Sequence, residues 1–157
     1  MHKRIGMLIF VFALSCFAAS LRAADDPLIG TWKLNLAKSK YNGMASPKSQ
    51  VYKYEANGPD GVKFINDTVN ADGTKVHAEY AVKFDGKEVP VTGDPLRDMT
   101  SNKRVDANTT SGTSTLKGKV ASTFTRVVSK DGKTLTVTAK GMQAGKPYDQ
   151  VAVYDRQ

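Results

Sequence analysis

The sequence predicts an all-β domain: an antiparallel up-and-down meander of eight to ten strands, closed into a barrel. After Pro27, apolar and polar residues alternate and almost nothing has a helical period. Four Asp-Gly pairs, at 60–61, 72–73, 85–86 and 131–132, have the composition of tight hairpin turns. An open meander leaves two unpaired edges, and closure removes them. A two-sheet sandwich is the alternative, but the regular short hairpins favour the barrel.

The clearest strand is Lys75 to Asp85, "KVHAEYAVKFD". Alternate side chains of a strand point to opposite faces of a sheet. One face therefore carries only apolar and aromatic residues: Val76, Ala78, Tyr80, Val82 and Phe84. The other face is mostly charged, so this strand is predicted to be half-buried.

The remaining strands are assigned from the same alternation and from the turns between them. The expected strands cover 31–36, 50–56, 62–69, 75–85, 88–91, 103–106, 113–117, 120–128, 134–139 and 150–154. We expect residues 38–48 to form an open loop, because Gly43 and Pro47 both oppose a helix there.

Residues 1–24 have the anatomy of a secretory signal peptide. A basic start is followed by an uncharged stretch over 5–21, and the small residues Ala23 and Ala24 end it. A transmembrane anchor is the alternative, but the apolar run is short for a crossing of about 20 residues. A lipoprotein cut before Cys16 is a weaker one. We therefore predict a secreted or periplasmic protein without a stable membrane anchor after cleavage.

The rest of the chain, 25–157, is predicted to be one domain, because no linker or low-complexity run interrupts it. The only cysteine of the sequence is Cys16, which is removed with the signal peptide, so no disulfide is expected in the mature domain. The formal net charge is +8, but the basic residues are scattered and do not alternate with aromatic ones. This argues against a nucleic-acid partner, and we expect a monomer.

The opening "GTWKLN", the late "DGKTLTVTAKG" and the final "VAVYDRQ" resemble the calycin group, which contains the lipocalins and the fatty-acid-binding proteins. Gly30 and Trp32 match the Gly-x-Trp signature of lipocalins. The resemblance extends to small secreted bacterial lipocalin-like proteins. It implies that Trp32 plugs the closed end of the barrel, that Gly30 lets the chain cross beneath it, and that Arg156 packs over the indole.

The sequence departs from the fatty-acid-binding proteins in two places. Those proteins insert a pair of helices after the first strand, where this chain has only the segment 38–48. They also commonly hold the fatty carboxylate with an Arg-x-Tyr on the last strand. The corresponding residues here are Ala152, Val153 and Tyr154, so the arginine is missing.

Arg126 is the most notable single residue. In an unbroken strand it shares a face with Phe124 and points into the barrel. A buried arginine needs a carboxylate or another hydrogen-bonding partner. That partner is either an acidic group of a ligand or an internal Asp or Glu, unless a bulge turns Arg126 outward. The resemblance favours the ligand, because fatty-acid-binding proteins have an inward arginine just before this hairpin.

The predicted inner face mixes bulky residues with small ones such as Ala78, Ser122 and Ala139, which leaves room for a cavity. The candidate ligand-binding residues are Arg126, Tyr52, Tyr54, Tyr80, Phe84 and Phe124, and the barrel-closing residues are Gly30 and Trp32. The sequence thus predicts a barrel that binds a small hydrophobic or amphipathic molecule. The alternative is a structural or interaction barrel of the cell envelope with a solid core and no ligand.

Nothing in the sequence predicts catalysis, a metal site or a cofactor. His77 is the only histidine after the signal, and it falls on the polar face of its strand. One histidine without a cysteine does not make a zinc site, and no nucleophile–base pair can be assigned. We therefore predict that the protein is not an enzyme.

Overall fold

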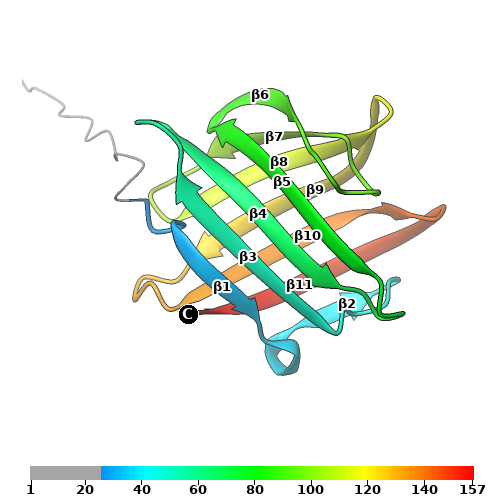
Figure 1. Ribbon diagram of the computed structural model, residues 1–157. Helices are drawn as coiled ribbons and strands as arrows, with labels where there is room; N and C mark the ends of the chain where they lie inside the picture. The colour runs from blue at the N-terminus through cyan, green and yellow to red at the C-terminus, as the bar shows by residue number, and fades with distance from the viewer. Residues whose placement is uncertain (1–25) are drawn as a thin grey trace, which may run out of the picture.

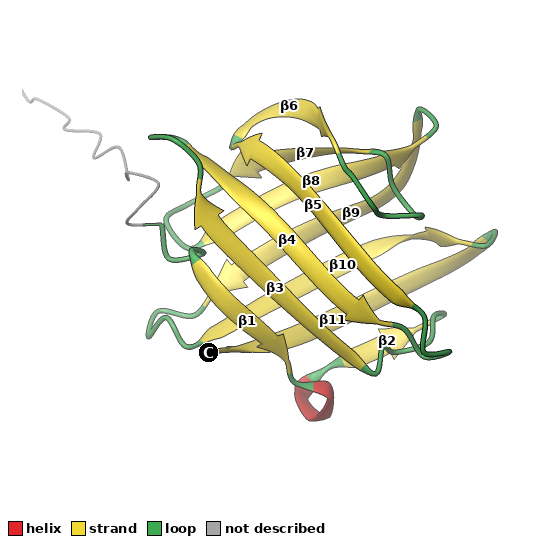
Figure 2. Ribbon diagram, viewed as in Figure 1, coloured by secondary structure: helices red, strands yellow, loops and turns green. Residues whose placement is uncertain are grey.

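The computed structural model describes residues 26–157, and the predicted signal peptide at 1–24 lies outside them. The described chain is almost entirely antiparallel strand, with one short 3₁₀ turn, η2 (Figure 2). This confirms the all-β prediction. In residues 26–157, no helix has both the length and the apolar character needed to cross a membrane.

The strands run in chain order around the barrel (Figure 1). Their bounds are β1 Gly30–Leu34, β2 Lys40–Asn42, β3 Ser49–Ala56, β4 Gly61–Val69, β5 Lys75–Lys83, β6 Asp85–Pro90, β7 Met99–Arg104, β8 Thr109–Leu116, β9 Lys119–Val128, β10 Thr134–Gln143 and β11 Lys146–Arg156, and η2 covers Leu36–Lys38.

The strand order is β5-β4-β3-β1-β11-β10-β9-β8-β7-β6, so the first long strand pairs with the last. The two edge strands, β5 and β6, do not form a ladder. The β5 edge is instead joined to the segment after β6 by one backbone pair, in which Glu79 and Thr92 exchange N–H···O bonds of 3.0 and 2.9 Å. The sheet is thus a nearly closed barrel, which confirms the predicted architecture over the sandwich.

Asp85-Gly86 was predicted to be a hairpin turn, and the chain does reverse there, since Glu79 and Thr92 on either side form an antiparallel pair; β5 and β6 themselves, however, form no ladder. Both residues lie inside β6, which pairs with β7 rather than with β5. Gly86 has a φ of 81°, and the register with β7 shifts between Asp85 and Glu88. The positive φ that glycine permits therefore forms a bulge in β6.

Two tight hairpins lie at positions without an Asp-Gly pair. Lys117-Gly118 joins β8 to β9 with φ values of 52° and 74°, and Ala144-Gly145 joins β10 to β11 with 49° and 76°. Two successive residues with positive φ are typical of type I′ turns, whose twist matches that of the strands they connect. As a result, β10 and β11 run beyond the predicted 134–139 and 150–154.

The segment 38–48 is more ordered than the open loop that was predicted. η2 begins after Asn35, whose side chain accepts a hydrogen bond from the Lys38 N–H. β2 then pairs with β11, with Tyr41 opposite Gln150. A loop assignment missed this strand because three residues are too few to show an alternation.

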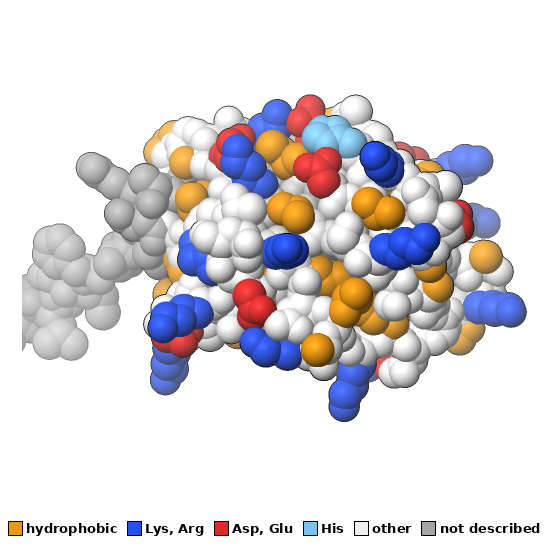
Figure 3. Space-filling model, turned by 60° about the horizontal axis from the view of Figure 1, so that its bottom comes forward, with side chains coloured by type: hydrophobic (Ala, Val, Ile, Leu, Met, Phe, Trp, Pro, Cys, Tyr) orange, Lys and Arg blue, Asp and Glu red, His pale blue; other side chains and the backbone are white. Residues whose placement is uncertain are grey.

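The interior has an aromatic half and a polar half. Edge-on and stacked rings from β3, β4, β5 and β11 fill the first half, and Tyr52 stacks on Tyr154 with centroids 4.5 Å apart. The inner faces of β7 and β8 bury small polar side chains instead: Thr100, Asn102, Thr110 and Ser114. On the face shown in Figure 3, basic side chains are spread over the surface among fewer acidic ones. The barrel therefore encloses a polar wall opposite an aromatic one.

Candidate functional site

One end of the barrel is closed by Trp32, which is completely buried. Its indole N–H donates to the Leu28 carbonyl at 2.9 Å, and Arg156 lies over its ring at 4.1 Å. Gly30 has a φ of 137°, and the Arg156 guanidinium occupies the space that a side chain there would fill. A ligand therefore cannot enter at this end.

The other end contains a cavity of about 470 Å³. Its rim is formed by the β2–β3 segment with Met44, the β4–β5 turn with Ala71, the β6–β7 loop with Leu96, and the end of β10 with Met142. Leu96 and Met142 are about half exposed, at 51% and 53%. The rim is thus partly apolar and open to an incoming molecule.

A chain of hydrogen bonds runs along one wall of this cavity. The Tyr154 hydroxyl donates to Gln50 Oε1 at 2.6 Å, and Gln50 Nε2 donates to the Thr68 hydroxyl at 2.8 Å. That hydroxyl donates in turn to Asn66 Oδ1 at 2.8 Å. Linked in this way, the polar groups are oriented, so this wall presents fixed hydrogen-bonding atoms to the cavity.

Arg126 lies inside the barrel and is only 4% exposed. It donates to Asn102 Oδ1 at 2.6 Å and to the Tyr80 hydroxyl at 2.8 Å, and it packs over the Phe124 ring at 4.1 Å. No ion pair joins it to a carboxylate in residues 26–157, and its Nε–H has no hydrogen-bond partner there. The interior therefore holds a positive charge that neutral groups alone solvate.

A second arginine, Arg97, lines the cavity from the β6–β7 loop. Its Nε donates to Asp94 Oδ2 at 2.7 Å, and both side chains are mostly buried. Neither residue is among the predicted site residues. The only signal available was an acidic and a basic residue three apart in a loop, which is common on protein surfaces.

The candidate residues occupy different depths. Tyr52 lines the cavity, whereas Tyr54 and Tyr80 lie beside Arg126 and are not part of the cavity lining. Burial raises the pKa of the Tyr54 hydroxyl well above its usual value, so this group stays neutral. Its oxygen is another buried polar atom without a partner in the described chain.

The two predicted phenylalanines also lie outside the cavity. Phe84 is at the closed end, where the Arg104 guanidinium packs over its ring at 4.1 Å and pairs with Asp26. Phe124 packs against Arg126 and against Gly112 on β8. Both rings support the barrel walls around the site.

The described residues contain no group of three or more His, Cys, Asp or Glu side chains that could hold a metal ion. His77 lies on the outer face, 63% exposed, with Nδ1 2.6 Å from Asp67 Oδ1. The site therefore consists of the cavity and the charged, hydroxyl-bearing groups beneath it.

Comparison with solved structures shows the same barrel in several proteins of low sequence identity. The fluorescent protein UnaG has a TM-score of 0.56 at 15% identity, with 82% of this chain and 96% of UnaG covered. Zebrafish ileal bile acid-binding protein, solved with cholic acid, has a TM-score of 0.50 at 14% identity, with 83% and 99% covered. Rv2717c from M. tuberculosis has a TM-score of 0.54 at 15% identity, with 85% and 95% covered.

These likenesses show that the chain has the same barrel fold as UnaG and the bile acid-binding protein, in agreement with the barrel that the sequence motifs predicted. No protein-family model matches the chain, and the search of curated proteins gives no significant match.

Proposed function

We propose that the protein binds a small amphipathic molecule with an acidic group in the cavity at the open end of the barrel. The observation that carries this proposal is the buried Arg126, whose contacts in the described chain are all neutral. An uncompensated buried charge costs free energy. Arg126 lies beneath the cavity and is not part of its lining, so an anion at the bottom of the cavity offsets that cost through its charge, which favours acids over neutral molecules.

The lining of the cavity supports an amphipathic rather than a purely apolar ligand. Amide groups of Gln50 and Asn66 face it together with the apolar rim. Arg97 adds a second guanidinium near the mouth, although Asp94 already pairs with it. The bile acid-binding neighbour, whose structure holds cholic acid, supports the same class of ligand.

The cavity also bears on the alternative of a solid structural barrel. Aromatic rings and small polar side chains fill the interior beneath the cavity, but about 470 Å³ near the mouth is not filled. That volume falls in the range of small-molecule sites. We therefore favour binding over a solid core. We also propose that the protein is exported, as the sequence of residues 1–24 suggests, and that it acts as a monomer.

The test compares cholate with its uncharged methyl ester, using calorimetry on the purified protein. We expect cholate to bind at least about tenfold more tightly than the ester, because only the charged acid offsets the uncompensated charge of Arg126. Arg126→Gln removes the charge and should abolish the preference, while Lys33→Gln, on the outer surface, should preserve it. Equal binding of acid and ester, or no binding of either, would refute the proposal.

A further inference from the structure

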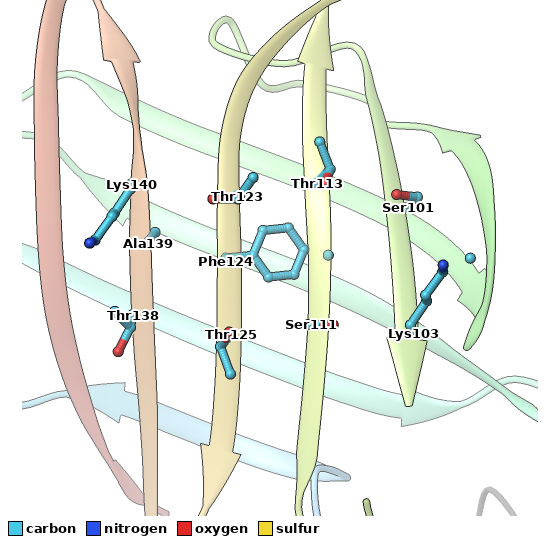
Figure 4. Close-up of a pocket in the computed structure, with 12 residues that line it drawn as sticks. Ser101, Lys103, Ser111, Thr113, Thr123, Phe124, Thr125, Thr138, Ala139 and Lys140 are labelled. Atoms are coloured by element: carbon cyan, nitrogen blue, oxygen red, sulfur yellow. The ribbon is translucent and has the colours of Figure 1, made fainter. Parts of the chain in front are cut away.

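A second hollow, of about 500 Å³, lies on the outer face of β7, β8, β9 and β10. Six hydroxyl side chains line it, with a lysine on each flanking strand (Figure 4). We call this surface the hydroxyl groove; its hydroxyl residues are Ser101, Ser111, Thr113, Thr123, Thr125 and Thr138, and its lysines are Lys103 and Lys140. The groove is separate from the interior cavity, because its side chains point away from the barrel.

The strand register arranges these side chains in two parallel rows. One row runs Ser101, Thr113, Thr123 and ends at Lys140, and the other runs Thr138, Thr125, Ser111 and ends at Lys103. Neighbouring strands lie about 4.8 Å apart, and alternate residues of a strand about 7 Å apart. The groove is therefore a grid of hydroxyls with one ammonium group at each of two diagonal corners.

The polar groups of the groove are free to bind a ligand. None of the six hydroxyls makes a side-chain hydrogen bond within residues 26–157, whereas Thr115, just outside, contacts Glu88. In the same range neither Lys103 nor Lys140 forms an ion pair with a carboxylate. Threonine favours strands in general, but that preference does not account for a hollow flanked by unpaired lysines.

The stem of Lys103 is held at the edge of the groove by the bulge in β6. Its side-chain carbons occupy the space that a Cβ on Gly86 would fill. Gly86 has a φ of 81°, a backbone conformation that glycine adopts far more readily than other residues. Packing of the stem restricts where the ammonium group can go, so less entropy is lost when a ligand binds it.

We propose that the hydroxyl groove binds an anionic glycan, an oligosaccharide carrying sulfate or carboxylate groups. The grid of hydroxyls matches the ring hydroxyls of sugars, and the diagonal lysines match anionic substituents. The carboxylates nearest the groove are Asp85, Glu88 and Asp149, the cross-strand neighbours of Lys103, Ser101 and Lys140; they lie on the flanking strands and do not line the groove. The only aromatic ring at the groove, Phe124, is buried and packs on Arg126 inside the barrel. This disfavours single-stranded nucleic acid, which needs exposed rings for stacking.

The test uses a heparin tetrasaccharide as the anionic probe, maltotetraose as the neutral control and tripolyphosphate as the anion without hydroxyls. Binding is measured by calorimetry and mapped by NMR amide shifts. We expect the heparin fragment alone to bind measurably, and its shifts to cluster on β7–β10. Comparable binding of maltotetraose or tripolyphosphate would overturn the proposal, and so would shifts outside these strands.

Paired variants separate a specific groove from general positive charge. Lys103→Gln/Lys140→Gln should weaken binding roughly five- to tenfold, as expected for two exposed ion pairs. Lys33→Gln/Lys146→Gln makes the same change in net charge elsewhere and should leave affinity within about twofold. Thr123→Val/Thr125→Val keeps shape and charge and should also weaken binding. Equal losses in both lysine pairs, or none in the threonine pair, would contradict the proposal.

Discussion

The guanidinium of Arg156 lies 4.1 Å from the centre of the Trp32 ring and at the same time donates to three backbone carbonyls. Those acceptors are Gly132 at 2.5 Å, Ile29 at 2.7 Å and Pro27 at 2.6 Å. One side chain thus connects the first strand, the last strand, the β9–β10 turn and the segment that crosses the closed end. This contact fixes the base of the barrel.

Arg156→Ala should lower the free energy of unfolding by about 2–4 kcal/mol. The change removes a cation–π contact worth about 0.5–2 kcal/mol and charged hydrogen bonds that are partly exposed. Urea unfolding followed by Trp32 fluorescence measures the effect. Arg156→Lys keeps the charge but loses the planar guanidinium, so we expect its free energy of unfolding to lie between those of the wild-type protein and Arg156→Ala. A loss below about 0.5 kcal/mol for the alanine variant would show that this end does not depend on Arg156.

Gly112 and Phe124 provide a second stability test, in the polar wall of the barrel. A Cβ at Gly112 would lie 2.7 Å from Phe124 Cε2 and would also meet the Ser101 carbonyl. We expect Gly112→Ala to destabilise the protein by about 1–3 kcal/mol, the usual effect of overpacking. Thermal unfolding measures the change, with the outward Thr113→Ala as the control. If Gly112→Ala matches that control, the predicted packing is absent.

Much of the fold could be predicted from the sequence because alternation is a local signal. Every inward residue of β5 is apolar or aromatic, as the alternation predicts, and three of the four Asp-Gly pairs lie at hairpin turns between paired strands. At the fourth, Asp85-Gly86, the chain also reverses, but the positive φ of Gly86 lies in a bulge of β6, and β6 pairs with β7 instead of β5. No local pattern in the sequence indicates that pairing.

The site could be predicted only in part, because it depends on contacts distant in the sequence. Alternation places Arg126 inside the barrel, but its acceptor Asn102 is 24 residues away on another strand. No local pattern indicates that pairing. Much of the cavity rim is formed by loops and turns, including the loop that carries Arg97, and loops lack the periodicity that reveals strands.

The buried tyrosines predict a loss of stability at high pH. Burial raises the pKa of Tyr52, Tyr54 and Tyr154 above the usual 10, so the folded state binds their protons more tightly than the unfolded state does. Their contribution is complete below the unfolded pKa and declines as the pH rises above it. We expect the urea midpoint to fall above about pH 10, and tyrosinate absorbance from these rings to appear only on unfolding. Full ionisation of all tyrosines in the folded protein would contradict this.

Filling the cavity should separate ligand binding from stability. Ser122 lines the cavity next to Gly141, where no side chain competes for space. Ser122→Leu should therefore reduce cholate affinity at least about tenfold, by occupying the ligand's volume, while changing the free energy of unfolding by less than about 1.5 kcal/mol. Thr123→Leu places the same side chain on the outer face of the same strand and should leave cholate binding unchanged. Calorimetry on both variants measures whether cholate occupies the interior cavity. Equal affinities would show that cholate binds outside the barrel, since only one of the two leucines lies inside it.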